Sequence, residues 1–242
     1  IRDVRTAAKQ LRLDEHGFEF TRHVSQVARD PELFAASNFP ESLPTGLRGQ
    51  YAAELEAFVK ARTNATTVMP QINSFLVRAS NRAKQKSWAG TAGLVHLDYT
   101  ETSARQLRDW TLEAHGLPLP PHRYFAFIQT WRAVSPGPQD NCLCVCDGSS
   151  VPYSDAVHID AVMGPADVPA MCFEFRLCKN GPGHSWYYLS NMDADDVLLF
   201  KGYDSRYPQA MNAMHSAFDN PHAGPDAPPR HSIEARFLAF YD

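Results

Sequence analysis

The sequence predicts a mainly β protein with flanking helices and with enough strands to wind a double-stranded β-helix. Five strand-like runs, rich in aromatic and β-branched residues, follow residue 96: Tyr124–Trp131, Cys142–Asp147, Met171–Leu177, Trp186–Leu189 and Val197–Tyr203. Helical periodicity is limited to two stretches, near residues 47–63 and 103–115. The chain has 242 residues, 44% of them hydrophobic, and single β-barrels of this length are common. We therefore expect one domain over 1–242, with an N-terminal strand and supporting helices in 1–66 and a jelly-roll core in 67–242.

The N-terminal part is expected to supply an edge strand and a covering helix. Residues 17–24 begin with alternating apolar and polar side chains, so Phe18 and Phe20 should point inward. The neighbouring His16 is expected on the surface. Residues 47–63 carry apolar side chains on one stripe, which is typical of an amphipathic helix that lies on a sheet.

The elements that follow lead to the centre of the chain and to its end. Residues 67–77 are expected to form a strand, and residues 81–91, polar and glycine-bearing, a loop close to the site. A helix is expected to begin after a cap at Thr102 or Ser103 and to end near Gly116 and Pro118. Residues 232–241 alternate as a last strand.

The most informative motif lies at the end of a predicted strand, Leu94–Thr100. It contains His96 and Asp98, and these two side chains should point the same way because an extended chain alternates its faces. An imidazole and a carboxylate are two of the three ligands of the triad that holds a non-haem Fe(II) and leaves coordination positions open. This motif therefore predicts part of an iron site.

A second His-x-Asp motif, His158-Ile159-Asp160, competes with the first, and spacing alone does not choose between them. It follows a turn-like stretch, Ser149–Ser154, and leaves only three strand-like runs before the tail. Both observations favour His96 and Asp98.

The tail offers the third ligand and a cation. His215 is followed, after a Pro/Gly-rich loop, by Arg230 and Ser232 on the last predicted strand. A His followed by Arg-x-Ser can complete the face of the metal and hold the far carboxylate of a 2-oxo acid, because a buried carboxylate needs a partner and arginine binds one through two hydrogen bonds. His184 is the alternative third ligand, and Arg236 is the alternative cation.

Several segments resemble, in order, a family of secondary-metabolism proteins that includes the gibberellin desaturase-like fungal proteins and the smaller component of the cephalosporin 7α-methoxylase pair. The segments are VHLDYT, TWRAV, CDGSSV, HSWYYLSNM, DVLLFKGYDS, HSAFDNP and PRHSIEARFLAFYD. The resemblance implies a jelly-roll, cupin-like oxygenase core that uses Fe(II), 2-oxoglutarate and O2. Carried over by position, it implies metal ligands at His96, Asp98 and His215 and a cosubstrate cation at Arg230, although the gap from His215 to Arg230 is long for such oxygenases.

Five further residues are candidates for contact with the substrate or cosubstrate. An arginine at the end of a buried strand either reaches solvent or holds a carboxylate, and the resembling proteins carry a Trp-Arg pair at this place. Alternate aromatic residues on a strand can line a pocket together. The candidates are Arg132, Trp131, Tyr99, Trp186 and Tyr188.

Composition excludes several other classes of function. Lys and Arg number 23 against 27 Asp and Glu, without a basic stripe, so no nucleic-acid partner is expected. No apolar run reaches the length of a membrane span, and we expect no membrane partner. The five cysteines are odd in number and no secretory signal precedes them, which favours reduced, buried thiols and a cytoplasmic location. The chain opens on Ile1, so its natural start is expected upstream, and a homodimer is compatible with its composition.

These observations predict an Fe(II)/2-oxoglutarate-dependent oxygenase that oxidises a C–H bond of a small-molecule secondary metabolite or an amino-acid-derived intermediate. Hydroxylation, desaturation and oxidative cyclisation all stay open. Two alternatives are a cupin-like metal-dependent isomerase or cyclase that does not use 2-oxoglutarate, and a non-catalytic small-molecule-binding barrel.

Overall fold

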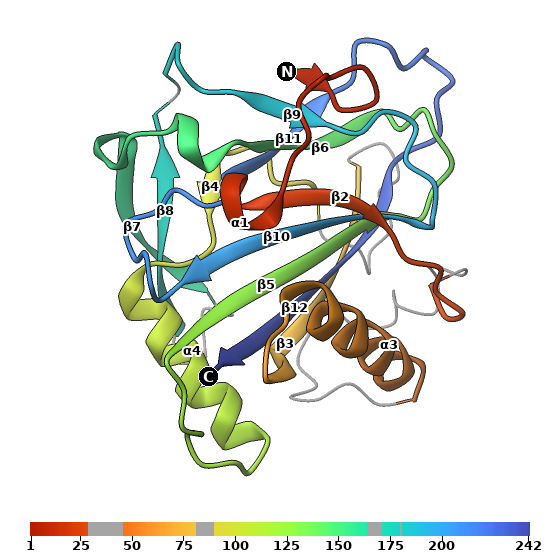
Figure 1. Cartoon of the computed structure of the whole chain (residues 1–242). Coiled ribbons are helices and arrows are strands. Elements are labelled where there is room, and N and C mark those ends of the chain that lie inside the picture. The colour runs from red at the N-terminus through yellow and green to blue at the C-terminus, as the bar shows by residue number, and fades with distance from the viewer. Residues whose placement is uncertain (29–45, 81–89, 164–170, 180) are drawn as a thin grey trace.

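Two β-sheets form the body of the molecule, as Figure 1 shows. A computed structural model describes residues 1–28, 46–80, 90–163, 171–179 and 181–242. The seven-stranded sheet has the order β1-β9-β6-β11-β4-β8-β7 and the five-stranded sheet the order β2-β10-β5-β12-β3. The sheets face each other, because one core cluster joins Phe18 and Trp131 of the five-stranded sheet to Val145 and Tyr187 of the seven-stranded sheet.

The strands of the seven-stranded sheet include two very short ones. Their bounds are β1 (Arg2–Asp3), β4 (His96–Leu97), β6 (Asn141–Cys146), β7 (Ala156–Met163), β8 (Met171–Cys178), β9 (Trp186–Tyr188) and β11 (His215–Asp219). The strands of the five-stranded sheet are β2 (Phe18–Arg22), β3 (Thr67–Ala79), β5 (Tyr124–Ala133), β10 (Asp196–Asp204) and β12 (His231–Tyr241). The two N-terminal strands thus extend both sheets.

Helices cover the five-stranded sheet and close one end of the molecule. The helical elements are α1 (Leu13–His16), α3 (Gly46–Thr63), α4 (Glu101–Ala114) and two 3-10 turns, η1 (Gly148–Ser150) and η2 (Tyr153–Asp155). Helix α3 lies on the outer face of β3 and β12, where Tyr51 and Leu55 pack with Ile128 and Phe237 (Figure 1). Helix α4 packs against β3 and β8.

The predicted strands, the two predicted long helices and the predicted fold class are confirmed in outline. The strand expected at Leu94–Thr100 is shorter, because the Thr100 side chain accepts a hydrogen bond from the Ser103 N–H and so caps α4 in place of Thr102 or Ser103. The chain must therefore leave the sheet directly after Leu97. The predicted loop at 81–91 lies largely outside the described residues.

One strand was missed, and one expectation was wrong. Strand β7 was not expected, yet it pairs with β8 along its whole length. His16 was expected on the surface but is 7% exposed, because its Nδ1 accepts a hydrogen bond from the Arg12 N–H at 2.9 Å and the ring folds back on α1.

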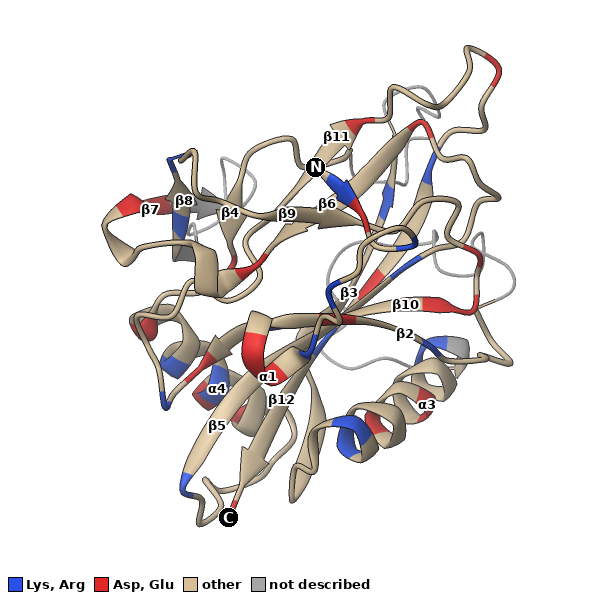
Figure 2. Ribbon diagram, turned by 45° about the horizontal axis from the view of Figure 1, so that its top comes forward, with Lys and Arg blue, Asp and Glu red and all other residues tan. Residues whose placement is uncertain are grey.

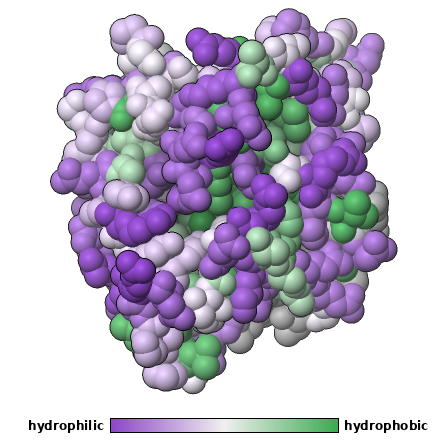
Figure 3. Space-filling view, viewed as in Figure 1, coloured by the Kyte–Doolittle hydropathy of each residue, from purple (hydrophilic) through white to green (hydrophobic). Residues whose placement is uncertain are grey.

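Charge and hydropathy are dispersed over the surface. Acidic and basic residues alternate over many elements without a basic stripe (Figure 2), and the face seen in Figure 3 is mostly hydrophilic with small separate hydrophobic patches. Among the described residues, no helix is long and apolar enough to cross a membrane.

Candidate metal centre

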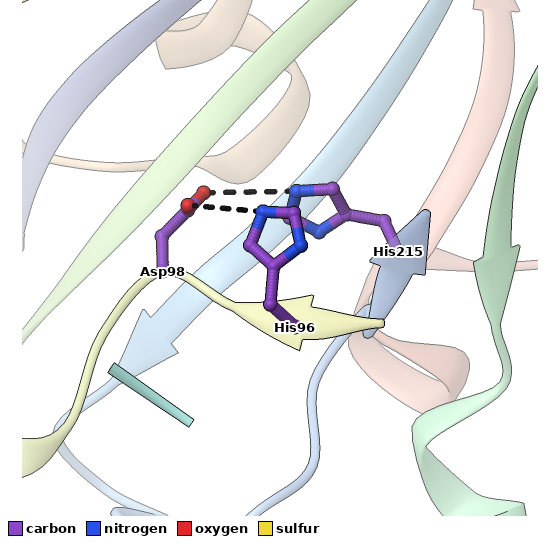
Figure 4. Close-up of side chains that lie close together, drawn as sticks. All are labelled: His96, Asp98 and His215. Atoms are coloured by element: carbon purple, nitrogen blue, oxygen red, sulfur yellow. Dashed lines mark ion pairs between the residues drawn. The ribbon is translucent and has the colours of Figure 1, made fainter. Parts of the chain in front are cut away.

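Strand pairing brings two of the predicted ligands together. Strands β4 and β11 are antiparallel, and His96 lies directly opposite His215. Directly opposed side chains point to the same face of a sheet, and the two imidazole centroids are 4.3 Å apart. Asp98 follows β4 by one residue and turns its carboxylate to the same side (Figure 4). The topology therefore assembles the three predicted residues from segments more than a hundred residues apart.

The ligand atoms of the three side chains converge. The Nε2 of His96 lies 3.6 Å from Oδ1 of Asp98, and the Nε2 of His215 lies 3.8 Å from Oδ2. All ligand atoms lie within 4.8 Å of one another. Ligands about 2.1 Å from a metal and at right angles to each other are about 3 Å apart, so a small inward movement would bring the three onto one ion.

Both histidines are already in the tautomer that a metal requires. Nδ1 of His96 lies 2.7 Å from the Leu94 carbonyl oxygen, and Nδ1 of His215 lies 3.1 Å from that of Ala213. A carbonyl can only accept, so each Nδ1 carries a proton, and Nε2 is the nitrogen left to bind a metal. Outer hydrogen bonds of this kind orient histidine ligands in metal sites.

The electrostatics of the three groups favour a cation. Burial, together with His96, lowers the pKa of His215 to about 4, so this ring is neutral at neutral pH. Burial opposes the charged form of Asp98, but Arg236 and the two histidines hold the pKa of its carboxyl well below the ordinary value. Two imidazoles and one carboxylate are the ligand set of a non-haem Fe(II) with open positions.

Two residues near Asp98, Gln129 and Glu234, were not predicted. Gln129 donates from Nε2 to Oδ2 of Asp98 at 2.6 Å and to Oε1 of Glu234 at 3.2 Å. Arg236, the predicted reserve cation, donates to Glu234 at 2.6 Å and to Asp98 at 3.4 Å. Alternation along residues 232–236 places Glu234 and Arg236 on the same face as Ser232. That this face meets Asp98 depends on how β12 pairs with β5, which the sequence does not show.

Arg230 is a buried cation with unused donors. It is 1% exposed, and among the described residues neither its Nε nor its Nη1 has a partner. Burial, and then the nearby Arg78, lowers its pKa to about 10. Its guanidinium lies over the ring of Trp131, 5.4 Å from the centroid, and Ser232 follows two residues later, at the start of β12. This group can take up an anion.

The structure does not bring Arg132 or Tyr99 to the triad. Arg132 lies opposite Ile233, on the face of β5 that α3 covers, and its Nη1 donates to the carbonyls of His23 and Ala194. Tyr99 is fully buried, with its ring stacked on Phe127 and its hydroxyl donated to Gln71. Neither side chain is free to contact a substrate.

Strand β9 faces the opposite way from the expectation. Tyr187 points between the sheets, where it packs with Phe18. Trp186 and Tyr188, the predicted pair, pack on the other face with Cys142 and Cys144. Alternation predicted which residues share a face but not which face is inside.

The competing ligands lie elsewhere. His158 is exposed, and its Nε2 is 2.9 Å from the Tyr153 hydroxyl. His184 is hydrogen-bonded to Asp155, 2.9 Å away, and to the backbone N–H of Gly181. Among the described residues, the cluster with the ligand geometry is His96, Asp98 and His215.

Comparison with known proteins gives the family. A family model described as an oxidoreductase/YMDC permease-like domain matches residues 1–240. The chain belongs to this family. The hydroxylase/desaturase efuI of Hormonema carpetanum is 28% identical over 100% of this chain and 83% of the relative. The Fe(II)/2-oxoglutarate-dependent dioxygenase nvfI of Aspergillus novofumigatus is 29% identical over 98% of this chain and 81% of the relative.

A solved structure agrees with these relatives. The iron and alpha-ketoglutarate-dependent endoperoxidase NvfI superposes with a TM-score of 0.80 at 26% identity, covering 98% of this chain and 81% of that chain. The resemblance to secondary-metabolism proteins and the jelly-roll core, both predicted from the sequence, are confirmed.

Proposed function

We propose that this chain is an Fe(II)/2-oxoglutarate-dependent oxygenase that oxidises a C–H bond of a small-molecule secondary metabolite. The observation that carries the proposal is the convergence of His96, Asp98 and His215, with the Nε2 atom of each histidine facing the Asp98 carboxylate. The names of the relatives support the same chemistry: one is an Fe(II)/2-oxoglutarate-dependent dioxygenase and another a hydroxylase/desaturase.

Each residue of the site has a separate task. His96, Asp98 and His215 hold Fe(II), and Arg230 with Ser232 binds the far carboxylate of 2-oxoglutarate. When bound, the metal supplies the place where O2 reacts as 2-oxoglutarate is decarboxylated to succinate and CO2. Arg236 does not take the carboxylate because Glu234 already pairs with it at 2.6 Å.

The surroundings of His96 support a substrate with apolar surface. Leu177 lies directly opposite His96, and Val157 lies opposite Leu177, so these side chains share its face of the sheet. Phe175 and Ile159 follow on the same face two residues further on. None of these four is fully buried, which leaves apolar surface open to a ligand. We propose that an apolar carbon skeleton lies here, and that its position decides between hydroxylation, desaturation and ring closure.

The proposal includes two expectations beyond the reaction, one about location and one about oligomeric state. The thiols of Cys142, Cys144 and Cys146 are free and buried, which is compatible with the expected cytoplasmic location. The expected homodimer would be tested by light scattering of the purified chain.

Succinate formation tests the proposal. Fe(II)-loaded protein supplied with 2-oxoglutarate and O2 should release succinate slowly even without substrate, and His215→Ala should not. A metal-dependent isomerase or a binding barrel would release none. Succinate at the buffer rate from the wild-type protein would therefore contradict the proposal.

A further inference from the structure

We propose that Gln129, Glu234 and Arg236 form a positioning network that fixes the Asp98 carboxylate, so that Oδ1 alone serves as the metal ligand. The inference rests on the proposed function, because it assigns a metal to Asp98. It extends that function to residues that do not touch the metal themselves.

Two donors bridge the same two carboxylates. The Gln129 amide nitrogen donates to Oδ2 of Asp98 at 2.6 Å and to Oε1 of Glu234 at 3.2 Å. The Arg236 guanidinium donates to the same two oxygens, at 3.4 Å and 2.6 Å. Both hydrogen bonds to Asp98 therefore use Oδ2, which lies 3.8 Å from Nε2 of His215. Oδ1 accepts neither of them and lies 3.6 Å from Nε2 of His96.

The orientation of the Gln129 amide follows from its partners. Both neighbours are carboxylates, which only accept hydrogen bonds, so the nitrogen and not the oxygen must face them. The amide oxygen then points to Gly202, where a Cβ would overlap with it and with the Tyr99 ring. Gly202 lies at a register shift of β10 against β5, so the irregularity of the strand creates the space that the amide occupies.

The network is built on the rigid part of the fold. Arg236 lies directly opposite Gln129 on the adjacent strands β12 and β5, both central in their sheet. Gln129 is fully buried and Glu234 is 6% exposed. A carboxylate buried beside another carboxylate is costly unless a cation and hydrogen bonds compensate it, and Arg236 supplies both. Glu234 in turn holds the Arg236 side chain in place at Asp98.

The consequence is a carboxylate with one oxygen held in place and one available. Free rotation of Asp98 would let both oxygens approach the metal and would close a position that the cosubstrate needs. Loss of an outer hydrogen bond in a metal site typically weakens metal binding by about 10- to 100-fold. Loss of the Gln129 amide should therefore reduce metal affinity without removing any ligand.

Titration of the full chain with Mn(II), in the absence of any cosubstrate, tests the network. Gln129→Met keeps the length of the side chain and removes the donor, and the Mn(II) dissociation constant should rise by about 10- to 100-fold. Gln139→Met is the matched control: Gln139 is 2% exposed, and its amide donates to the backbone carbonyls of Ser135 and Met192 and not to the network. Its Mn(II) affinity should stay within twofold of the wild-type value.

A second readout separates positioning from general destabilisation. The visible absorption of the Co(II)-loaded protein reports coordination geometry, and it should change in Gln129→Met but not in Gln139→Met. If Gln129→Met does not fold, Gln129→Asn, which withdraws the amide from Asp98, is measured against the same criteria.

Wild-type affinity and a wild-type spectrum in the Gln129 variant would overturn the network, and so would equal weakening in both glutamine variants. Failure of the wild-type protein to bind Mn(II) or Co(II) would instead contradict the metal site itself.

Discussion

Replacing Arg230 with methionine should stabilise the ligand-free protein. Burial and Arg78 lower the pKa of Arg230 to about 10, which corresponds to about 3 kcal/mol against the charged form in the folded protein. Because the guanidinium is charged at every pH below its lowered pKa, the folded state bears the full cost of burying that charge at pH 7. Loss of the contact with Trp131 offsets about 1 kcal/mol of the gain. The remaining 2 kcal/mol or so should raise the Tm by about 4–8 °C in a chain of this length.

The same substitution should abolish the response to 2-oxoglutarate. Two charge-assisted hydrogen bonds, worth about 1.5–3 kcal/mol each, would be lost, so the dissociation constant should rise by about 10²- to 10⁴-fold. Thermal unfolding of Mn(II)-loaded protein with and without 2-oxoglutarate measures both effects. Arg132→Met is the control: it breaks hydrogen bonds to the His23 and Ala194 carbonyls, so it should lower the Tm and keep the response. An Arg230→Met protein that melts below the wild type and is still stabilised by 2-oxoglutarate would refute this reasoning.

Three further predictions follow from single contacts. Asp98→Ala should lose Mn(II) binding by at least about 100-fold and release no succinate, and retention of either would remove Asp98 from the metal site. Gly202→Ala should lower the free energy of unfolding, measured in urea, by about 1–3 kcal/mol, because the added Cβ would overlap with Gln129 and Tyr99. Gly224→Ala is the control and should leave the free energy of unfolding unchanged, because the space around Gly224 is open. Equal effects of the two substitutions would contradict the packing described. Burial raises the pKa of Cys144 to about 12, so iodoacetamide at pH 8 should label it only after unfolding, and rapid labelling of the native protein would contradict its burial.

The three candidate ligands could be picked out of the sequence because their signals are local. A His-x-Asp at the end of a strand places both side chains on one face whatever the surrounding fold, and the tail offered few histidines as the third ligand. The distance between His96 and His215 was not predictable, because it depends on the direct pairing of β4 with β11. The same holds for Gln129 and Glu234, which reach Asp98 only through the register of β5 on β12.

Three features of the fold were missed or misplaced, each for its own reason. Strand β7 does alternate, with Val157 and Ile159 between polar residues, but it was not counted among the strand-like runs because a turn-like stretch, Ser149–Ser154, precedes it. For β9, the alternation of side chains showed that Trp186 and Tyr188 share one face, but it did not show which face of the strand points between the sheets. Trp186 and Tyr188 were expected to line the pocket, whereas the structure places Tyr187 between the sheets. Arg132 was favoured because its chemistry suits a carboxylate, yet its strand position turns it to α3.

Anaerobic titration of the Fe(II)-loaded protein with 2-oxoglutarate tests the metal centre most directly. Chelation of the metal by the keto acid should produce a weak visible metal-to-ligand charge-transfer band that saturates with 2-oxoglutarate and is absent in His215→Ala. A wild-type protein that stays colourless throughout the titration, or a His215→Ala protein that gives the same band, would contradict the joint binding of one ferrous ion by His96, Asp98 and His215.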